Sequence, residues 1–451
     1  MIPIVTPEEM AAVDAAAAES VEVLIGRAGA AVAWAARRML GGTYGRTVTV
    51  IAGKGNNGND GRAAADMLGR WGVRVDVVDA AACPSVLPAS DLVIDAAYGT
   101  GFRGEWWAPR AGAASVLAVD IPSGVDGATG AAGRGVLAAD RTITFQALKP
   151  GLLFGLGRWL AGEVHVADIG LDVSRTQAHL VGRDDVARWW RPRPPMAHKW
   201  TRAVRVVAGS PGMTGAAKLA AAAAQRAGAG MVGLSTPGID PATPVEVVGR
   251  RLPALDWAPA VLEDLDRYHA LVIGPGLGRE EHTVASIRKT VLEAPLPVVV
   301  DGDALFAMAW SDDGPAALLR RRDAPTVLTP HEGEHGLLTG RRPDADRILA
   351  TRRLAADTCS TVVLKGPTTV VAGPDGDVRV VTASDARLAT AGTGDVLSGI
   401  IGALLATGMP PLHAATSAVW LHGAAADACL PTGLVAGDLV DALPAVLVAL
   451  T

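Results

Sequence analysis

The stretch Thr47-Val48-Thr49-Val50-Ile51-Ala52-Gly53-Lys54-Gly55-Asn56-Asn57-Gly58-Asn59-Asp60-Gly61 decides the fold of the first half of the chain. Residues 47–52 form a short β-branched run, which predicts a buried strand. A glycine-rich turn over residues 53–61 follows directly. Such a turn at the carboxyl end of a strand is a usual binding place for an anionic ligand. The sequence therefore predicts a strand that leads into a binding loop.

Similar β-branched runs alternate with alanine-rich helical segments along both halves of the chain. Continuous apolar strands that alternate with helices indicate a parallel sheet covered on both faces. In such sheets, ligands bind beyond the carboxyl ends of the strands. The expected strands are residues 47–52, 73–78, 92–95, 116–120, 141–145 and 164–167 in the first half, and residues 204–208, 271–273, 298–301, 326–328, 361–364 and 369–372 in the second.

The chain is long enough for two domains. It has 451 residues, and a single hydrophobic core is unusual beyond about 250–300 residues. The prolines of Arg191-Pro192-Arg193-Pro194-Pro195 can continue neither a helix nor a central strand. We expect a first domain at residues 1–190, a linker at 191–197 and a second domain at 198–451. No fixed-period repeat relates the halves, so two different α/β domains are expected.

The composition is typical of a soluble α/β protein, with 49% apolar and 19% charged residues. A net charge of −5 without a large basic block argues against a nucleic-acid partner. Cys83, Cys359 and Cys429 are too far apart to predict a disulfide framework or a close-spaced zinc site. The N-terminus lacks the pattern of a signal peptide, and no apolar run reaches membrane-spanning length. We expect a cytoplasmic protein without a membrane partner.

A second glycine-rich stretch, Ala391-Gly392-Thr393-Gly394-Asp395-Val396-Leu397-Ser398-Gly399, places an acid at the start of an apolar helix. Backbone N–H groups and the positive end of the helix favour an anion there, while Asp395 is placed to accept a proton from a hydroxyl. These are the parts that phosphoryl transfer needs. Taken alone, the motif could also be a capped helix start. The chain is therefore predicted to carry two separate sites.

Several segments stand in an informative order: residues 55–61, 95–101 and 120–124 in the first half, and residues 208–210, 215–217, 274–278, 329–331, 365–366 and 391–399 in the second. Together they resemble the motifs of the bifunctional NAD(P)H-hydrate repair enzyme family over nearly the full chain. The resemblance implies an α/β protein with an N-terminal Rossmann-like parallel-sheet domain, an epimerase. A C-terminal ribokinase-like domain follows it, a dehydratase that depends on ADP or ATP.

For the first domain the resemblance implies a potassium ion held by Asn57, Asp95 and Ser123, and Asp120 as the acid–base group. The asparagines could instead only serve a tight turn, and Asp95 and Asp120 could be helix N-caps. The residues expected to line hydrated NADH or NADPH are Asn56, Asn57, Gly58, Asn59, Asp60, Gly99, Thr100, Gly101, Phe102, Arg103, Gly104, Glu105 and Asp120.

For the second domain the resemblance implies that Asp395 deprotonates the hydroxyl of the hydrated ring, which takes a phosphoryl group that then departs as phosphate. Lys365 could instead be a surface lysine and His331 a structural hydrogen-bonding residue. The expected substrate residues are Ala216, Gly276, Gly278, His331 and Asp395. The expected nucleotide residues are Lys365, Gly366, Pro367, Thr368, Thr369, Gly392, Thr393 and Gly394.

The implied cofactors are potassium and magnesium, with ADP or ATP as co-substrate, and we expect a homo-oligomer. The alanine-rich, arginine-over-lysine composition is typical of bacteria, whose family members are associated with ADP, so ADP is expected ahead of ATP. Asn59 replaces a usual glycine, and because asparagine tolerates left-handed backbone we expect it to keep the turn. Glu332 replaces a usual proline. The alternative functions are a small-molecule kinase for a vitamin alcohol or sugar and a cofactor-sensing protein without catalysis.

Overall fold

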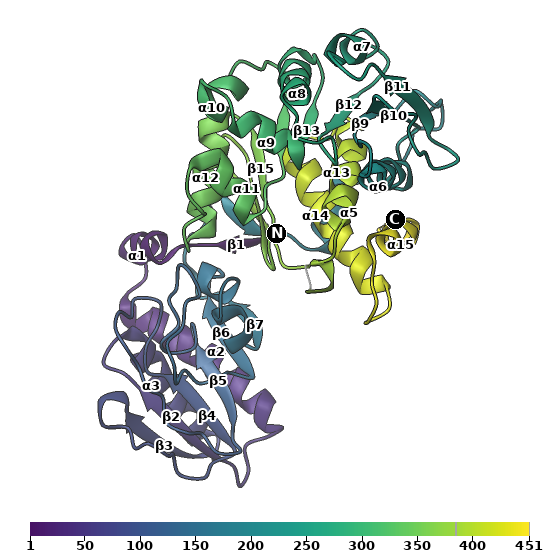
Figure 1. The fold of residues 1–451 in the computed structure, drawn as a ribbon. Coiled ribbons are helices and arrows are strands. Elements are labelled where there is room, and N and C mark those ends of the chain that lie inside the picture. The colour runs from purple at the N-terminus through teal and green to yellow at the C-terminus, as the bar shows by residue number, and fades with distance from the viewer. Residues whose placement is uncertain (384–385, 451) are drawn as a thin grey trace. The chain divides into compact units, whose positions relative to one another are not determined.

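The structure is a computed structural model that describes residues 1–383 and 386–450. Contacts between residues divide the chain into two compact units (Figure 1). One unit holds residues 2–178, and the other holds Met1 and the chain from His179 onward. Residues 179–190, which the sequence assigned to the first domain, therefore pack with the second unit. The functional boundaries at 190 and 197 stay a prediction.

The first unit contains a parallel sheet with the strand order β3-β2-β4-β5-β6-β7. Each strand expected in this half is present, with its ends shifted by no more than one residue. The chain adds β3 on one side of β2 and β4 on the other, and this reversal places a ligand crevice between β2 and β4. The strands are β2 (Thr47–Ala52), β3 (Arg74–Asp79), β4 (Leu92–Ala96), β5 (Ser115–Val119), β6 (Arg141–Phe145) and β7 (Glu163–Ala167).

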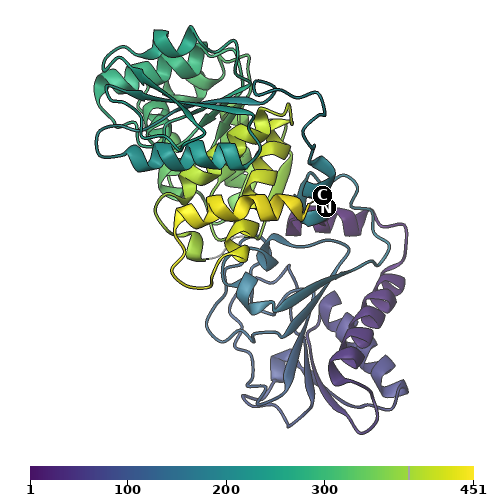
Figure 2. The ribbon, with the colours of Figure 1, turned by 90° about the vertical axis from the view of Figure 1, so that its right-hand side faces the viewer.

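Helices α2 (Val21–Leu40) and α3 (Asn56–Arg70) pack together on one face of this sheet (Figure 2). Their alanines let the helices approach the strands closely, so this face is the larger part of the unit's core. A smaller apolar cluster covers the opposite face. The remaining elements are β1 (Ile2–Ile4), α1 (Pro7–Ala15), η1 (Ala80–Ala82), η2 (Pro150–Leu152) and α4 (Gly157–Leu160).

The second unit is built on a sheet whose order includes β17-β16-β15-β14-β13-β12-β9-β10-β11. Neighbours from β15 to β11 are parallel, whereas β16 is antiparallel to both β15 and β17. The expected strands are present as β9 (Ala203–Val207), β12 (Ala270–Ile273), β13 (Val298–Val300), β14 (Thr326–Leu328), β15 (Thr361–Leu364) and β16 (Thr369–Ala372). The sequence did not predict β8 (Ala178–Leu180), β10 (Met231–Pro237), β11 (Val248–Leu252) or β17 (Val378–Val381).

Both faces of this sheet carry helices. The largest core cluster lies under α6 (Thr214–Arg226), α13 (Thr393–Leu405), α14 (Pro411–Ala428) and α15 (Ala436–Val448). The opposite face is covered by α8 (Glu281–Glu293), α9 (Asp303–Ala309), α11 (Glu332–Thr339) and α12 (Arg347–Thr358). The other helices are α5 (Arg183–Trp189), α7 (Ala258–Leu262), α10 (Gly314–Leu319) and η3 (Ala386–Leu388).

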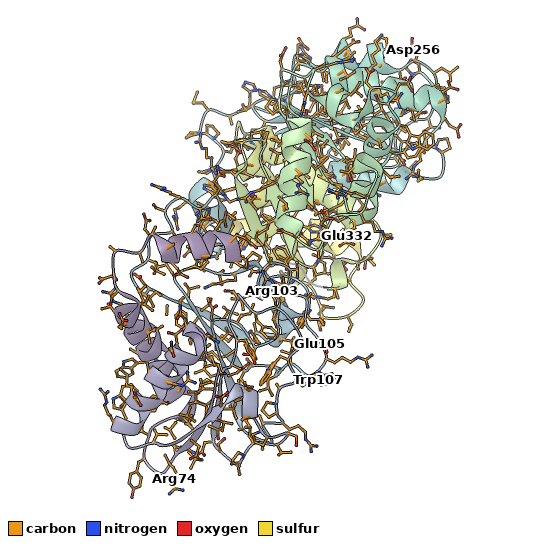
Figure 3. All side chains as sticks on the ribbon, turned by 90° about the vertical axis from the view of Figure 1, so that its left-hand side faces the viewer. Arg74, Arg103, Glu105, Trp107, Asp256 and Glu332 are labelled. Atoms are coloured by element: carbon orange, nitrogen blue, oxygen red, sulfur yellow. The ribbon has the colours of Figure 1, made fainter. Side chains whose placement is uncertain are left out.

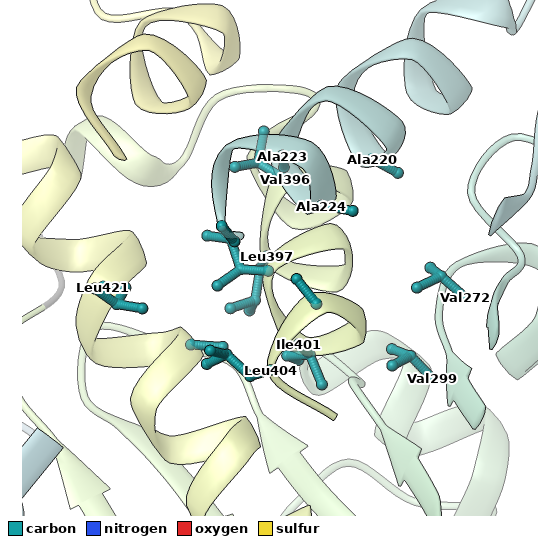
Figure 4. Packing of buried hydrophobic residues seen from close by; sticks show 14 of the residues in the cluster. Ala220, Ala223, Ala224, Val272, Val299, Val396, Leu397, Ile401, Leu404 and Leu421 are labelled. Atoms are coloured by element: carbon teal, nitrogen blue, oxygen red, sulfur yellow. The ribbon is translucent and has the colours of Figure 1, made fainter. Parts of the chain in front are cut away.

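Small residues let α13 pack closely against α6. This contact fixes the position of α13, the helix that begins with the Gly-Thr-Gly turn. A Cβ atom on Gly399 would lie 2.2 Å from the carbonyl oxygen of Ala220, so only glycine fits there. Val396, Leu397 and Ile401 fill the space around this contact (Figure 4). Over the described residues, no helix combines the length and apolar character needed to cross a bilayer.

Candidate active sites

Asp120 is the charged centre of the first site. It directly follows β5 and lies in left-handed backbone, with φ 67°, a conformation that a residue other than glycine rarely adopts. Its Oδ1 lies 2.8 Å from Nζ of Lys149 and accepts a hydrogen bond from Thr144 at 3.1 Å. Its Oδ2 accepts from the backbone N–H of Thr100 at 3.4 Å. Asp120 precedes no helix, so the N-cap alternative is wrong for it.

Lys149, the partner of Asp120, lies outside the motifs that the sequence indicates. Its side chain is 2% exposed, and Nζ also donates to the carbonyl oxygen of Phe145 at 2.9 Å. The residue follows β6, the neighbour of β5, so its place beyond a strand end was available as a signal. The buried ion pair fixes the orientation of the Asp120 carboxylate.

A cavity of about 580 Å³ opens beside Asp120 at the carboxyl ends of β2, β4 and β5. Met10 and Leu24 give it an apolar wall on the helical side. Most of the expected epimerase residues line this cavity, namely Asn56, Asn57, Asp60, Gly99, Thr100, Gly101, Phe102 and Asp120. The cavity has the size of a small-molecule site, about 300–1,000 Å³.

Asp60 is a second acidic group on the cavity wall, and only 7% of the residue is exposed. Burial, reinforced by the negative charges of Asp120 and Asp14, raises the pKa of Asp60 to about 8. At neutral pH this side chain is therefore mostly protonated, whereas Asp120 has an ammonium partner. The cavity thus contains two carboxyl groups in different environments.

The outer part of the expected epimerase loop is exposed. Arg103, Gly104 and Glu105 are exposed, and Trp107 on the same loop is 66% exposed. Figure 3 labels Arg103, Glu105 and Trp107. The structure does not bring these residues to the cavity wall. Their expected contacts with substrate stay a prediction.

The expectation of a long glycine turn at residues 53–61 is wrong in part. Helix α3 begins at Asn56, so Asn59 is helical and needs no left-handed backbone to keep the turn. Gly58 is required for a different reason, because a Cβ atom there would lie 1.9 Å from the carbonyl oxygen of Gly53. The asparagines therefore form the first turn of a helix whose positive end faces the cavity.

The residues expected to hold potassium lie near the same strand ends. Ser123 Oγ donates to Asp95 Oδ1 at 2.6 Å, and the backbone N–H of Ser123 donates to Oδ2 at 2.9 Å. Burial raises the pKa of Asp95 despite these hydrogen bonds. The side-chain oxygen and nitrogen of Asn57 are buried and have no hydrogen-bond partner among the described residues. A buried carboxylate and an unsatisfied amide oxygen are the kinds of ligand that a hard cation takes. Asp95 lies inside β4 and caps no helix.

Asp395 lies in the first turn of α13, as the sequence predicted. The preceding Gly392 is left-handed, with φ 91°, which favours glycine. Thr393 Oγ1 donates to the carbonyl oxygen of Leu388 at 2.8 Å and holds the turn in place. Burial, together with the charges of nearby acidic residues, raises the pKa of Asp395 to about 7. Such a carboxylate is a stronger base than an ordinary aspartate.

His422 supports the same turn from α14. Its Nε2 lies 2.9 Å from the carbonyl oxygen of Thr393. Burial lowers the pKa of His422 to about 4, so the ring is neutral at pH 7. Because a carbonyl oxygen only accepts hydrogen bonds, Nε2 carries the proton and donates a hydrogen bond to the carbonyl oxygen of Thr393. His422 lies outside the motifs that the sequence indicates.

Lys365 is not a surface lysine. It follows β15, its side chain is 22% exposed, and Nζ lies 3.1 Å from Asp301 Oδ1 and 3.6 Å from Glu334 Oε2. A Cβ atom on Gly394 would lie 3.6 Å from this Nζ. The structure therefore places a fixed positive charge beside the Gly-Thr-Gly turn.

The expected nucleotide residues Gly366, Pro367 and Thr368 lie in the tight connection from β15 to β16, and Thr369 is the first residue of β16. Thr369 Oγ1 donates to the carbonyl oxygen of Gly366 at 3.2 Å. Arg347 packs over this connection, donating to the carbonyl oxygen of Lys365 at 3.0 Å and pairing with Glu332 at 2.5 Å. The unusual Glu332 thus has a basic partner on α12.

The expected substrate residues of the second unit come from different elements: Ala216 lies on α6, Gly276 and Gly278 follow β12, His331 follows β14, and Asp395 lies on α13. Gly276 is left-handed, with φ 62°, and a Cβ atom on it would lie 3.2 Å from Cβ of Ala216. The backbone N–H of Gly278 donates to Asp303 Oδ2 at 2.9 Å. The hydrogen bond fixes the glycine loop against the start of α9, while Gly276 lies close to α6.

His331 is the N-cap of α11. Its Nδ1 accepts from the backbone N–H groups of Gly333 at 2.9 Å and Glu334 at 3.2 Å, and Glu334 completes a capping box. The structure thus supports the structural alternative for Nδ1. Nε2 carries the remaining proton, so a substrate contact through that atom stays a prediction.

Comparison with known proteins tests the family. Residues 204–444 match the NAD(P)H-hydrate dehydratase family, and residues 21–85 and 79–151 match the YjeF-related protein N-terminus. A bifunctional NAD(P)H-hydrate repair enzyme of Mycobacterium tuberculosis is 40% identical over 405 residues, which cover 83% of this chain and 82% of that protein. The chain belongs to the bifunctional NAD(P)H-hydrate repair enzyme family. The resemblance found in the motifs is thereby confirmed.

Solved structures place the second unit of this repair-enzyme family member in the ribokinase-like fold. The ADP/ATP-dependent NAD(P)H-hydrate dehydratase of Bacillus subtilis, co-crystallised with ATP and Mg²⁺, is 32% identical, with a TM-score of 0.51, over 60% of this chain and 98% of that chain. A ribokinase-like protein of Enterococcus faecalis, 21% identical with a TM-score of 0.52 over 61% of this chain and 97% of that chain, shows the same fold. The expected fold class is confirmed, and these matches do not favour the vitamin or sugar kinase alternative.

Proposed function

We propose that the chain repairs hydrated NADH and NADPH in two steps, epimerisation in the first unit and nucleotide-dependent dehydration in the second. The observation that carries the proposal is a basic carboxylate, Asp395, at an amide-lined helix start beside Lys365. It lies within a segment that matches the dehydratase family. A binding protein without catalysis would not need such a base.

The dehydratase step converts a poor leaving group into a good one. Asp395 accepts the proton of the ring hydroxyl while the hydroxyl oxygen attacks the terminal phosphorus of the nucleotide. The bond between that phosphorus and the bridging oxygen of the nucleotide breaks. The backbone N–H groups of Gly392, Thr393 and Gly394 face the transferred group, where they stabilise its charge. The bond from the ring carbon to the phosphate oxygen then breaks, the adjacent carbon gives up a proton to water, and the ring double bond forms between the two carbons. The products are the reduced cofactor, phosphate and the shortened nucleotide.

The epimerase step fits the cavity beside Asp120. Epimerisation breaks and re-forms a bond at one carbon, so it needs a group that gives and takes a proton. Asp120 lies on the cavity wall, and Lys149 holds it in one orientation. The two-site arrangement lets both epimers be recovered even if only the S form fits the second site.

Potassium and magnesium belong to the proposal. Asn57, Asp95 and Ser123 would hold potassium, which would supply positive charge near the phosphates of the dinucleotide. Within residues 1–383 and 386–450, no cluster of three or more His, Cys, Asp or Glu side chains is arranged to hold a metal ion. Magnesium is therefore expected to bind mainly through the nucleotide phosphates, where it neutralises their charge. ADP remains the preferred donor of this proposal, ahead of ATP.

The direct test incubates hydrated NADH with the protein, magnesium and either ADP or ATP. Repair predicts recovery of the reduced-ring absorbance and release of one phosphate per ring restored. A small-molecule kinase would instead accumulate a stable phosphorylated product. Size-exclusion chromatography with light scattering tests the expected homo-oligomer, and cell fractionation tests the expected cytoplasmic location.

A further inference from the structure

Asp301 is a buried carboxylate to which the proposed reaction assigns no role. It directly follows β13, and its side chain is 4% exposed. An unpaired charge at this depth would be strongly unfavourable, since burial penalises ionised groups. Its partners therefore determine whether it is ionised and what it does.

Hydrogen-bond donors from three other elements converge on this carboxylate. Thr329, just after β14, donates to Oδ1 at 2.6 Å, and Lys365, just after β15, donates to the same oxygen at 3.1 Å. Ser398 of α13 donates to Oδ2 at 2.6 Å. One side chain thus connects adjacent strand ends to the first turns of the helix that carries Asp395.

The charges around Asp301 and Lys365 keep both groups ionised. Burial acts to raise the pKa of Asp301, but Lys365 and the hydroxyls of Ser398 and Thr329 outweigh it and the pKa is lowered. Burial acts to lower the pKa of Lys365, but Asp301, Glu334 and Asp395 outweigh it and the pKa is raised. The result is a rigid ion pair next to the Gly-Thr-Gly turn.

We propose that Asp301 is a positioning residue for the phosphoryl transfer. It holds the Lys365 ammonium beside the turn that receives the transferred group, and its fixed negative charge strengthens Asp395 as a base. Asp301 itself touches neither substrate nor nucleotide in this role. The inference rests on the dehydratase function proposed above, and it adds a residue outside the motifs that carry that function.

The test is the pH dependence of dehydration by the full-length Asp301→Asn variant, with the S hydrate, ADP and magnesium. The charged groups that face Asp395 are Asp301, Asp303, Glu334 and Lys365. Removing one negative neighbour should move the acid limb of kcat against pH at least about one unit lower, because a nearby charge shifts a carboxyl pKa by about one to three units. The maximal rate should fall at least about 10-fold, as Lys365 loses its anchor.

Ser398→Ala and Thr329→Val are matched controls, because each removes one donor but leaves the Asp301 charge in place. Both should slow the reaction less than Asp301→Asn and leave the acid limb where the wild type has it. If Asp301→Asn also keeps the wild-type limb, the residue is only structural and the proposal is overturned. A wild type that restores no reduced cofactor at any pH would instead refute the proposed function itself.

A second comparison covers the case in which Asp301→Asn does not fold. The double variant Asp301→Asn/Lys365→Met leaves no unpaired buried charge. Because Asp301 acts on the pKa of Asp395 more strongly than Lys365 does, the acid limb of the double variant should lie at lower pH than that of the wild type. A limb at the wild-type pH or above it would contradict the role assigned to Asp301.

Discussion

At the scale of single residues, the second site depends on the protonation of Asp395. Burial and neighbouring acids raise its pKa to about 7, so the basic form is lost as the pH falls through that value. We expect dehydration to have an acid limb near pH 7, measured as kcat against pH. Asp395→Asn should lower kcat roughly 10²–10⁴-fold, which is the usual contribution of a positioned base. A rate like that of the wild type in this variant would show that another group is the base.

The first site makes a residue-scale prediction about stability. Lys149 and Asp120 form a buried pair 2.8 Å apart, and removing one member of such a pair costs about 3–5 kcal/mol because the other charge is left alone. Lys149→Met should therefore lower the Tm of the full chain, measured by scanning calorimetry. Adding Asp120→Asn to it should restore part of the loss, since the lone anion is then neutral. If the double variant loses as much Tm as the two single variants together, the pairing of Lys149 with Asp120 is contradicted.

Some of these residues could be predicted from the sequence and others could not. Asp120 and Asp395 were predicted because each belongs to a local motif that follows a strand or opens a helix. Lys149 and Asp301 each follow a strand, but their partners are distant in sequence: Asp120 for Lys149, and Thr329, Lys365 and Ser398 for Asp301. Such contacts are not encoded in one short segment. Asn59 was misjudged because the glycines near it serve close backbone contacts rather than left-handed turns.

At the scale of elements, the contact between α6 and α13 places the Gly-Thr-Gly turn. Gly399→Ala would put a Cβ atom 2.2 Å from the Ala220 carbonyl oxygen, and overpacking of this kind costs about 1–3 kcal/mol. We expect a lower Tm and a slower dehydratase. The matched control is Gly437→Ala in α15, where a Cβ atom meets nothing within 4 Å. That change should be neutral or stabilising, and a Gly399→Ala variant as stable as this control would contradict the packing.

Strand prediction succeeded where the β-branched runs were uninterrupted. β10 was missed because it contains Gly233, whose Cβ would lie 2.3 Å from the hydroxyl oxygen of Tyr268. Glycine is usually unfavourable in a strand, and here it is needed for a side chain that packs on the sheet. β17 follows Asp375-Gly376, a turn that predicts a hairpin with β16. That signal was present and was not used.

At the scale of the whole molecule, two families matched in order along one chain imply two reactions that share an intermediate. Each unit has its own sheet and its own carboxylate beyond the strand ends. The two activities should therefore be separable by single substitutions. The order of the motifs predicted that each unit carries one reaction. The oligomeric state depends on surfaces that no motif describes.

The measurement that tests the central claim most directly is recovery of reduced-ring absorbance from the purified R and S hydrates, with ADP and magnesium. The wild type should restore both epimers. Asp120→Asn should restore the S hydrate at the wild-type rate and leave the R hydrate largely unused, whereas Asp395→Asn should restore neither. Equal recovery of both hydrates by Asp120→Asn, or any recovery by Asp395→Asn close to that of the wild type, would contradict the account.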